Sequence, residues 1–274
     1  MRGQMIDHEA TALLEGKLHD QQRAEAIAAG KPAPQFPWNP MLDTWAPARL
    51  YNGMIAPLTP FPIRGVIWYQ GESNSALARA PLYERLFETL ITDWRGQWAE
   101  GDFPFLYVQI SNFKSSPQED WATIREAQRR TLKLRNTAMA VTIDVGNPDN
   151  VHPTDKVTVG HRLALAARKI SYGEALEDSG PTIRQTTTEG SALRLWFNHA
   201  TGLHVQGGPL ASFEVAGSDG VFHPALATID GSTIVLTSAE VTHPVWARYG
   251  WANSPDCHLF NGDGLPASPF TTQP

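Results

Sequence analysis

Residues 64–74 read Arg64-Gly-Val-Ile-Trp-Tyr-Gln-Gly-Glu-Ser-Asn74. The continuous apolar run at 66–69, with its β-branched and aromatic members, is typical of a strand buried on both faces of a sheet. The run stops abruptly in a polar cluster at 70–74. Because ligands bind beyond the carboxyl ends of strands in an open parallel sheet, this cluster is a candidate reaction site, and the alternative is a polar loop that only turns the chain.

The residues that follow repeat an alternation of strand and helix. Strands are predicted at 64–70, 103–110 and 138–144, and each is followed by a helix, at 81–98, from Pro117 to about Leu134, and from Thr154 to Gly173. Ser116 is the expected N-cap of the second helix, with Glu119 completing a capping box, and Thr154 is the expected cap of the third. This α/β pattern predicts a parallel sheet flanked by helices, whose strand ends all lie at one edge.

The sequence on either side of this core has a different character. An amphipathic helix is predicted at 7–29, followed by a proline-rich connection at 31–49. From Thr182 onward, short alternating runs separated by glycine turns predict a small antiparallel β region, with a hairpin at 229–233 around Asp-Gly. The expected domains are residues 1–49 for the N-terminal helix and connection, residues 50–176 for the α/β core, and residues 177–274 for the C-terminal β region, which is expected to pack on the core.

Composition excludes several classes of protein. The 274 residues are 42% hydrophobic, enough for a buried core, and the net charge of −6 argues against a nucleic-acid surface. No apolar run approaches the length of about 18 residues that spans a membrane. The single cysteine, Cys257, excludes an internal disulfide and a cysteine-based metal cluster.

The loop after the third strand contains a candidate catalytic pair. Asp149 and His152 lie three residues apart, so the carboxylate can hold one ring nitrogen while the other faces a reacting hydroxyl. This predicts a general base, although His152 could instead cap the helix. A metal site is the competing interpretation, but Asp149, His152 and His161 match no recognised ligand spacing, and no cofactor is expected.

Several motifs resemble the sialate O-acetylesterase family of the SGNH hydrolase superfamily. They are Trp-Tyr-Gln-Gly-Glu-Ser-Asn at 68–74, Asn-Pro-Asp-Asn-Val-His-Pro at 147–153, Gly-His-Arg-Leu-Ala-Leu-Ala-Ala at 160–167, and shorter stretches at 50–58, 125–128 and 264–270. The resemblance implies an SGNH-like fold, with Asp149 and His152 as the catalytic Asp-x-x-His block. It also implies that Gln70 and Gly71 help to form the oxyanion hole, and that Glu72 and Asn74 orient them.

One departure from the family is important. The family places its nucleophilic serine in a Gly-Gln-Ser-Asn segment after the first sheet strand, and this sequence has no such segment. The expectation is a fold incomplete at its N-terminus, whose nucleophile is supplied from outside the sequence. Ser73 is an alternative nucleophile, because it lies between a strand and a helix as in a nucleophile elbow, although Ser75 stands where that motif has glycine.

The resemblance implies an esterase that removes O-acetyl groups from sialic acid or related sugars. The alternative is a non-catalytic carbohydrate-binding protein of the same fold, with Trp251 stacking on sugar. An incomplete sheet should expose an apolar edge, at 64–70 or 103–110, through which the chain would self-associate. The family favours an exported or periplasmic location, although residues 1–30 lack the apolar segment of a secretory signal.

Overall fold

The computed structural model describes residues 2–36 and 48–274, which form two compact units, Met1–Pro62 and Ile63–Pro274. The first unit contains helix α1 (Arg2–Ala28) and two short helical turns, η1 (Tyr51–Ile55) and η2 (Ala56–Leu58). The predicted helix at 7–29 is therefore confirmed, and it begins earlier than expected. Most of the predicted proline-rich connection, residues 37–47, lies outside the described residues.

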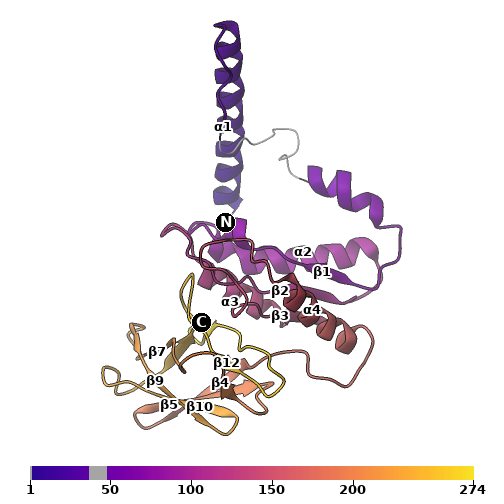
Figure 1. The fold of residues 1–274 in the computed structure, drawn as a ribbon. Coiled ribbons are helices and arrows are strands. Elements are labelled where there is room, and N and C mark those ends of the chain that lie inside the picture. Colours follow the sequence, from indigo (N-terminus) through magenta and orange to yellow (C-terminus); the bar gives the residue numbers. More distant parts are fainter. Residues whose placement is uncertain (1, 37–47) are drawn as a thin grey trace. The chain divides into compact units, whose positions relative to one another are not determined.

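The second unit contains the predicted parallel sheet. Strands β1 (Val66–Trp68), β2 (Phe105–Val108) and β3 (Thr137–Ala140) pair in parallel in the order β1-β2-β3. Helices α2 (Tyr83–Trp98), α3 (Trp121–Thr131) and α4 (Lys156–Ile170) follow the three strands in turn. Figure 1 shows the strands side by side with these helices around them. The α/β prediction is confirmed.

The two faces of this sheet are covered unequally. On one face, Phe87 of α2 packs its ring against Trp68, Phe105 and Tyr107, with centroids 5.0–6.1 Å apart. On the other face, Leu106 and Ala138 pack against Ala166 of α4. Ile67 is in register with Leu106 and Ala138 and shares their face, yet it is 70% exposed.

The exposure of Ile67 and the order of the strands each correct one prediction. Strand β1 is not buried on both faces, because α4 packs against β2 and β3 and leaves β1 bare on that side. The strand predicted at 103–110 is not an exposed edge, because β2 lies between β1 and β3. Among the described strands, β1 pairs only with β2, so its other edge has free backbone donors and acceptors.

Both predicted helix caps are wrong. Helix α3 is capped by Asp120, whose carboxylate accepts the Thr123 N–H at 2.9 Å, and Glu119 accepts the Trp121 indole N–H instead of closing a capping box. Helix α4 is capped by Asp155, which accepts the Thr158 N–H at 3.0 Å. Each aspartate lies three residues before the backbone N–H that donates to it. A carboxylate is also a stronger hydrogen-bond acceptor than a serine or threonine hydroxyl.

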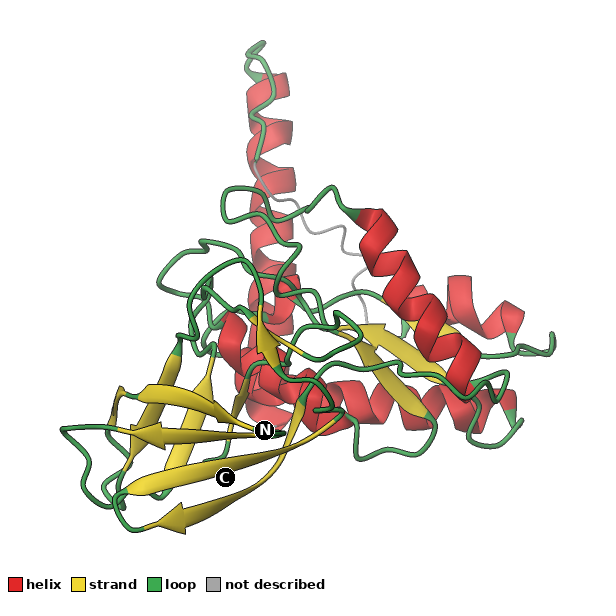
Figure 2. Ribbon diagram, turned by 60° about the horizontal axis from the view of Figure 1, so that its bottom comes forward, coloured by secondary structure: helices red, strands yellow, loops and turns green. Residues whose placement is uncertain are grey.

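The C-terminal half of the second unit is antiparallel, as predicted. Its strands are β4 (Thr182–Glu189), β5 (Ala192–Asn198), β6 (His204–Val205), β7 (Phe213–Ala216), β8 (Phe222–Pro224), β9 (Leu226–Asp230), β10 (Thr233–Thr237), β11 (Trp246–Tyr249), β12 (Leu259–Phe260) and β13 (Phe270–Thr271). They form sheets β4-β5-β10-β9, β13-β11-β7-β8 and β12-β6, drawn in yellow in Figure 2. The predicted hairpin is confirmed, because Asp230 pairs with Thr233 across a two-residue turn in which Gly231 has φ +60°.

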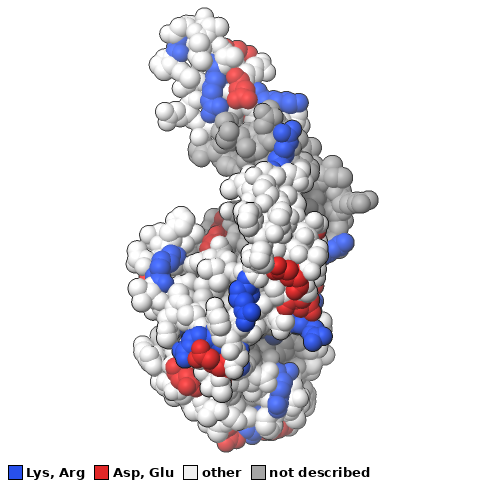
Figure 3. Space-filling view, turned by 90° about the vertical axis from the view of Figure 1, so that its right-hand side faces the viewer, with Lys and Arg blue, Asp and Glu red and all other residues white. Residues whose placement is uncertain are grey.

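Two surface properties bear on function. On the face drawn in Figure 3, acidic and basic side chains are interspersed. Within residues 2–36 and 48–274, none of the helices has the length and apolar character needed to cross a bilayer.

Candidate active site at the carboxyl ends of the parallel strands

Gln70, just beyond β1, is held by three neighbours, two of which contact its side chain. The Tyr83 hydroxyl contacts both the carbonyl and the Oε1 of Gln70, at 3.0 and 3.1 Å, and Gln128 Nε2 donates to the same carbonyl at 3.0 Å. Gln70 Nε2 donates to Asn74 Oδ1 at 2.7 Å. Since an amide nitrogen carries two hydrogens, this bond leaves one N–H for a substrate oxygen.

Gly71 is buried where the chain leaves the sheet, and its backbone lies close to three side chains. A Cβ atom at this position would lie 2.9 Å from Ile110 Cγ2, 3.0 Å from Ile124 Cγ2 and 3.1 Å from Gln128 Nε2. Because the same Gln128 amide holds the Gln70 carbonyl, the lack of a side chain at Gly71 allows the Gln70 contact to form.

This packing gives a first prediction. Gly71→Ala is expected to destabilise the protein by about 1–3 kcal/mol, because the added methyl overpacks this contact. The measurement is urea unfolding, with Gly160→Ala as the control, since a Cβ at that helical glycine meets nothing within 4 Å. A Gly71→Ala variant as stable as the control would contradict the close packing described here.

Residues Glu72, Ser73 and Asn74 form the 3-10 turn η3 (Glu72–Asn74). Burial, and secondarily the nearby Glu72 carboxylate, raise the pKa of Tyr69 to about 12. Tyr69 therefore stays protonated and neutral beside this turn. Ser73 is exposed, and in the part of the chain that the structure describes no hydrogen bond joins it to His152.

The structure places Asp149 and His152 in one exposed loop after β3, but it does not join their side chains. The nearest charged partner of Asp149 is Lys114, whose Nζ lies 3.7 Å from Oδ1. The loop is shaped by local turns, in which Asn147 Oδ1 accepts the Asp149 N–H and Asn150 Oδ1 accepts the His152 N–H, both at 2.9 Å. The described residues provide no hydrogen-bond partner for the His152 ring, which is therefore open to a reacting hydroxyl.

Sequence reasoning missed a partly buried ion pair at the base of this loop. The two terminal nitrogens of Arg162 each donate to one Asp144 oxygen at 2.6 Å. The available signal was an aspartate at a strand end followed by an arginine on the next helix, but such a pairing is not specific enough to predict from sequence.

The C-terminal β region contacts the β2 end through particular residues that sequence reasoning did not identify. Arg125 is fully buried and donates to the carbonyls of Ser111, Ala252 and Asn253, and its burial lowers its pKa to about 10. Gln109 Nε2 donates to Ser268 Oγ at 2.9 Å. Contacts with these C-terminal residues thus fix the end of β2 and the loop that follows it.

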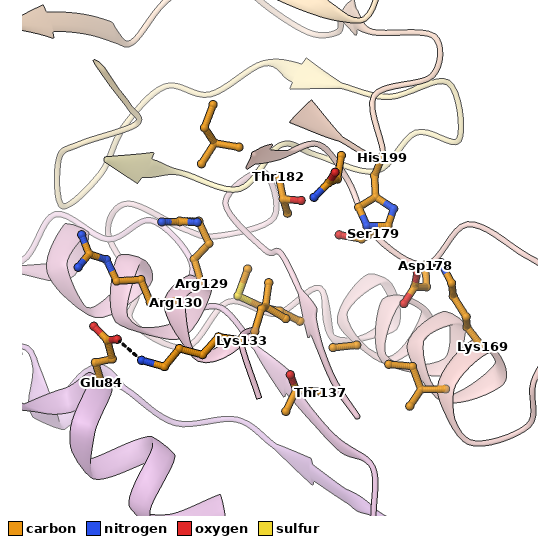
Figure 4. A pocket seen from close by; sticks show the side chains of 16 residues that line it. Glu84, Arg129, Arg130, Lys133, Thr137, Lys169, Asp178, Ser179, Thr182 and His199 are labelled. Atoms are coloured by element: carbon orange, nitrogen blue, oxygen red, sulfur yellow. Dashed lines mark hydrogen bonds and ion pairs between the residues drawn. The ribbon is translucent and has the colours of Figure 1, made fainter. Parts of the chain in front are cut away.

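A hollow between helices α3 and α4 and strands β3 and β4 is not a convincing ligand site. It has a volume of about 660 Å³, and Figure 4 shows Lys133 reaching Glu84 and Lys169 lying beside Asp178. Each of its cationic side chains already has a carboxylate partner: Lys133 has Glu84 and Glu88, Lys169 has Glu177 and Asp178, and Arg129 and Arg130 share Glu126. Each positive charge is therefore neutralised by a neighbouring carboxylate. This favours the interpretation of the hollow as a solvated network of ion pairs over that of a ligand site.

One group of potential metal ligands occurs among the described residues. One ligand atom from each of Glu177, Asp178 and His199 lies within 4.8 Å of the others. Lys169 Nζ already lies 2.6 Å from Asp178, and His199 Nδ1 lies 2.7 Å from Glu177. Asp178 is thus already paired with a lysine and Glu177 with the histidine, and nothing else marks the group as a cation site.

Comparisons with known proteins agree on one family. A family model described as carbohydrate esterase, sialic acid-specific acetylesterase, matches residues 39–169. The sialate O-acetylesterase of Mus musculus is 34% identical over 254 residues, covering 82% of this chain and 47% of the relative. The human enzyme is 33% identical over 251 residues, covering 81% of this chain and 48% of the relative. This chain thus spans about half the length of the curated relatives it matches.

The structural comparison gives the same result. A crystal structure of a carbohydrate acetylesterase from Xanthomonas citri superimposes with a TM-score of 0.79 and 44% sequence identity, covering 90% of this chain and 57% of that chain. Because 90% of this chain is covered, the similarity extends over both the α/β sheet and the antiparallel region.

Proposed function

Because the chain belongs to the sialic acid-specific acetylesterase family of carbohydrate esterases, we propose that it carries the base and oxyanion half of a serine esterase acting on acetylated sugars. The observation that carries this proposal is the arrangement at one sheet edge. Gln70 is fixed with one N–H to spare after β1, and His152 presents an unengaged ring after β3.

In the proposed reaction, His152 removes the proton of a serine hydroxyl as the hydroxyl attacks the acetyl carbonyl. Asp149 turns from Lys114 to the other ring nitrogen and holds the imidazole in the required tautomer. Gln70 Nε2 and the Gly71 N–H donate to the oxyanion of the tetrahedral intermediate. His152 then gives this proton to the departing sugar oxygen, which leaves as a hydroxyl, and water releases acetate from the serine by the same steps.

We propose that the serine arrives on a strand that pairs with the free edge of β1. Two observations support this. Among the described residues, no serine hydroxyl is bonded to His152, and β1, the strand that leads to Gln70, has an unpaired edge and an exposed Ile67. Ser73 remains the alternative nucleophile within the chain itself.

Acetate release from three substrates tests the proposed function: O-acetylated sialic acid, an acetylated neutral sugar and p-nitrophenyl acetate. The proposed substrate class predicts turnover of at least one sugar ester by a polypeptide extended upstream to a Gly-x-Ser strand, and loss of turnover in its Ser→Ala variant. If the extended polypeptide is inert on all three substrates, the esterase assignment is wrong.

A non-catalytic carbohydrate-binding role is the second candidate. Trp251 lines a separate hollow of about 390 Å³ together with Arg248, whose guanidinium lies 5.9 Å from the indole ring and 4.1 Å from the Phe222 ring. Aromatic faces beside planar polar groups suit sugar rings. Saturable sugar binding that is lost in Trp251→Ala, with no turnover in any extended form, would favour this role.

A further inference from the structure

The loop that carries Asp149 and His152 is closed at its base by the Asp144–Arg162 pair. Asp144 follows β3, and Arg162 lies on α4, the helix that begins where the loop ends. Their side chains are 16% and 7% exposed, and the guanidinium also donates to the Val141 carbonyl at 2.7 Å. Bidentate, charge-assisted bonds shielded from water are among the strongest polar contacts in proteins.

Beyond this pair, the loop has few attachments to the rest of the protein. The Lys114 N–H donates to the Pro148 carbonyl at 2.8 Å, and Gly146 packs so closely on the β2 end that a Cβ there would lie 1.9 Å from Asn112 Oδ1. The Lys114–Asp149 ion pair is 69% and 83% exposed, so it contributes little. Residues 149–152 are otherwise held by turns within the loop.

We propose that the Asp144–Arg162 pair positions this loop, so that His152 is held at the sheet edge opposite Gln70. Asp144 and Arg162 are positioning residues that act through the loop. Asp144 is held by Arg162 through both oxygens, whereas Asp149 has only an exposed contact with Lys114, so Asp149 is the carboxylate placed to turn toward His152. The proposal rests on the proposed function only for its catalytic consequence, because loop order can be measured without any substrate.

The first test measures backbone motion by ¹⁵N relaxation in two variants. Asp144→Asn removes one charge but leaves Arg162 buried and unpaired, which threatens folding. The double variant Asp144→Asn/Arg162→Met removes both charges and avoids that penalty. Order parameters at 145–152 are expected to fall from about 0.85 to below about 0.6 in the double variant, while those at 105–108 stay unchanged.

The matched control is Arg168→Met on the same helix, which breaks an exposed ion pair with Glu174, beyond the helix end, and should leave the loop unchanged. If residues 145–152 stay as ordered in the double variant as in the control, the proposal is overturned. Global unfolding of both Asp144 variants would also overturn it, because the pair would then be a determinant of the whole fold.

The second test is kinetic and separates positioning from general stability. In a preparation that hydrolyses p-nitrophenyl acetate, the double variant is expected to lose about 10²-fold in kcat with little change in KM, because a loop displaced by about 1 Å misaligns the base. Equal kcat in the double variant and the control would overturn the proposal. If the wild type hydrolyses no ester, the proposed function fails, and the relaxation measurement still decides the role of the pair.

Discussion

His152→Ala is expected to lower kcat/KM for p-nitrophenyl acetate by about 10²- to 10⁴-fold, the range that a well-aligned general base contributes. The variant is made in the polypeptide extended upstream to a Gly-x-Ser strand. The side chain is exposed and, within the described part of the chain, makes no hydrogen bond through its ring, so its loss removes no packing or polar contact. The melting temperature should therefore stay unchanged while hydrolysis is lost.

The matched control is His161→Ala, which removes another exposed imidazole, on helix α4. It is expected to leave both kcat/KM and the melting temperature unchanged. An equal loss of hydrolysis in the two variants, or no loss in either, would contradict the role given to His152.

The second large effect concerns the free edge of β1. Residues 1–274 alone are expected to bind a dye that reports exposed apolar surface and to self-associate, because Ile67 is 70% exposed on a strand with one unpaired edge. Ile67→Lys is expected to reduce both the dye signal and the light scattering. Since the side chain is exposed, the free energy of unfolding should change by no more than about 0.5 kcal/mol.

Leu226→Lys is the control for this effect, because Leu226 is 78% exposed on β9, in a different sheet. It should leave self-association unchanged. In the extended polypeptide, Ile67→Lys should also weaken hydrolysis, because docking the added strand would bury a charge. A wild-type chain that runs as a clean monomer with low dye binding and a cooperative melt would contradict an open edge at β1.

The sequence was sufficient to predict the elements whose signals are local. Apolar periodicity predicted the alternation of strands and helices, and Asp230-Gly231 predicted the hairpin between β9 and β10. The burial of β1 was predicted wrongly, because an apolar strand at the edge of a sheet has the same composition as a central one. Whether a partner covers Ile67 is a property of the tertiary structure.

The contacts that fix the candidate site are distant in sequence, and no local pattern encodes them. Gln128 of helix α3 reaches Gln70 beyond β1, and Arg125 binds carbonyls of the C-terminal region. The strand-end motifs could nevertheless be located from sequence, because polar residues after buried strands are conspicuous. Their roles in the reaction remain predictions.

The most direct test of the account compares ester hydrolysis by three proteins: residues 1–274, the polypeptide extended upstream to a Gly-x-Ser strand, and the extended polypeptide with His152→Ala. The account predicts acetate release only by the second, with residues 1–274 at background. Hydrolysis by residues 1–274 alone that is lost in Ser73→Ala would contradict the claim that the nucleophile docks on β1, and would place it within this chain.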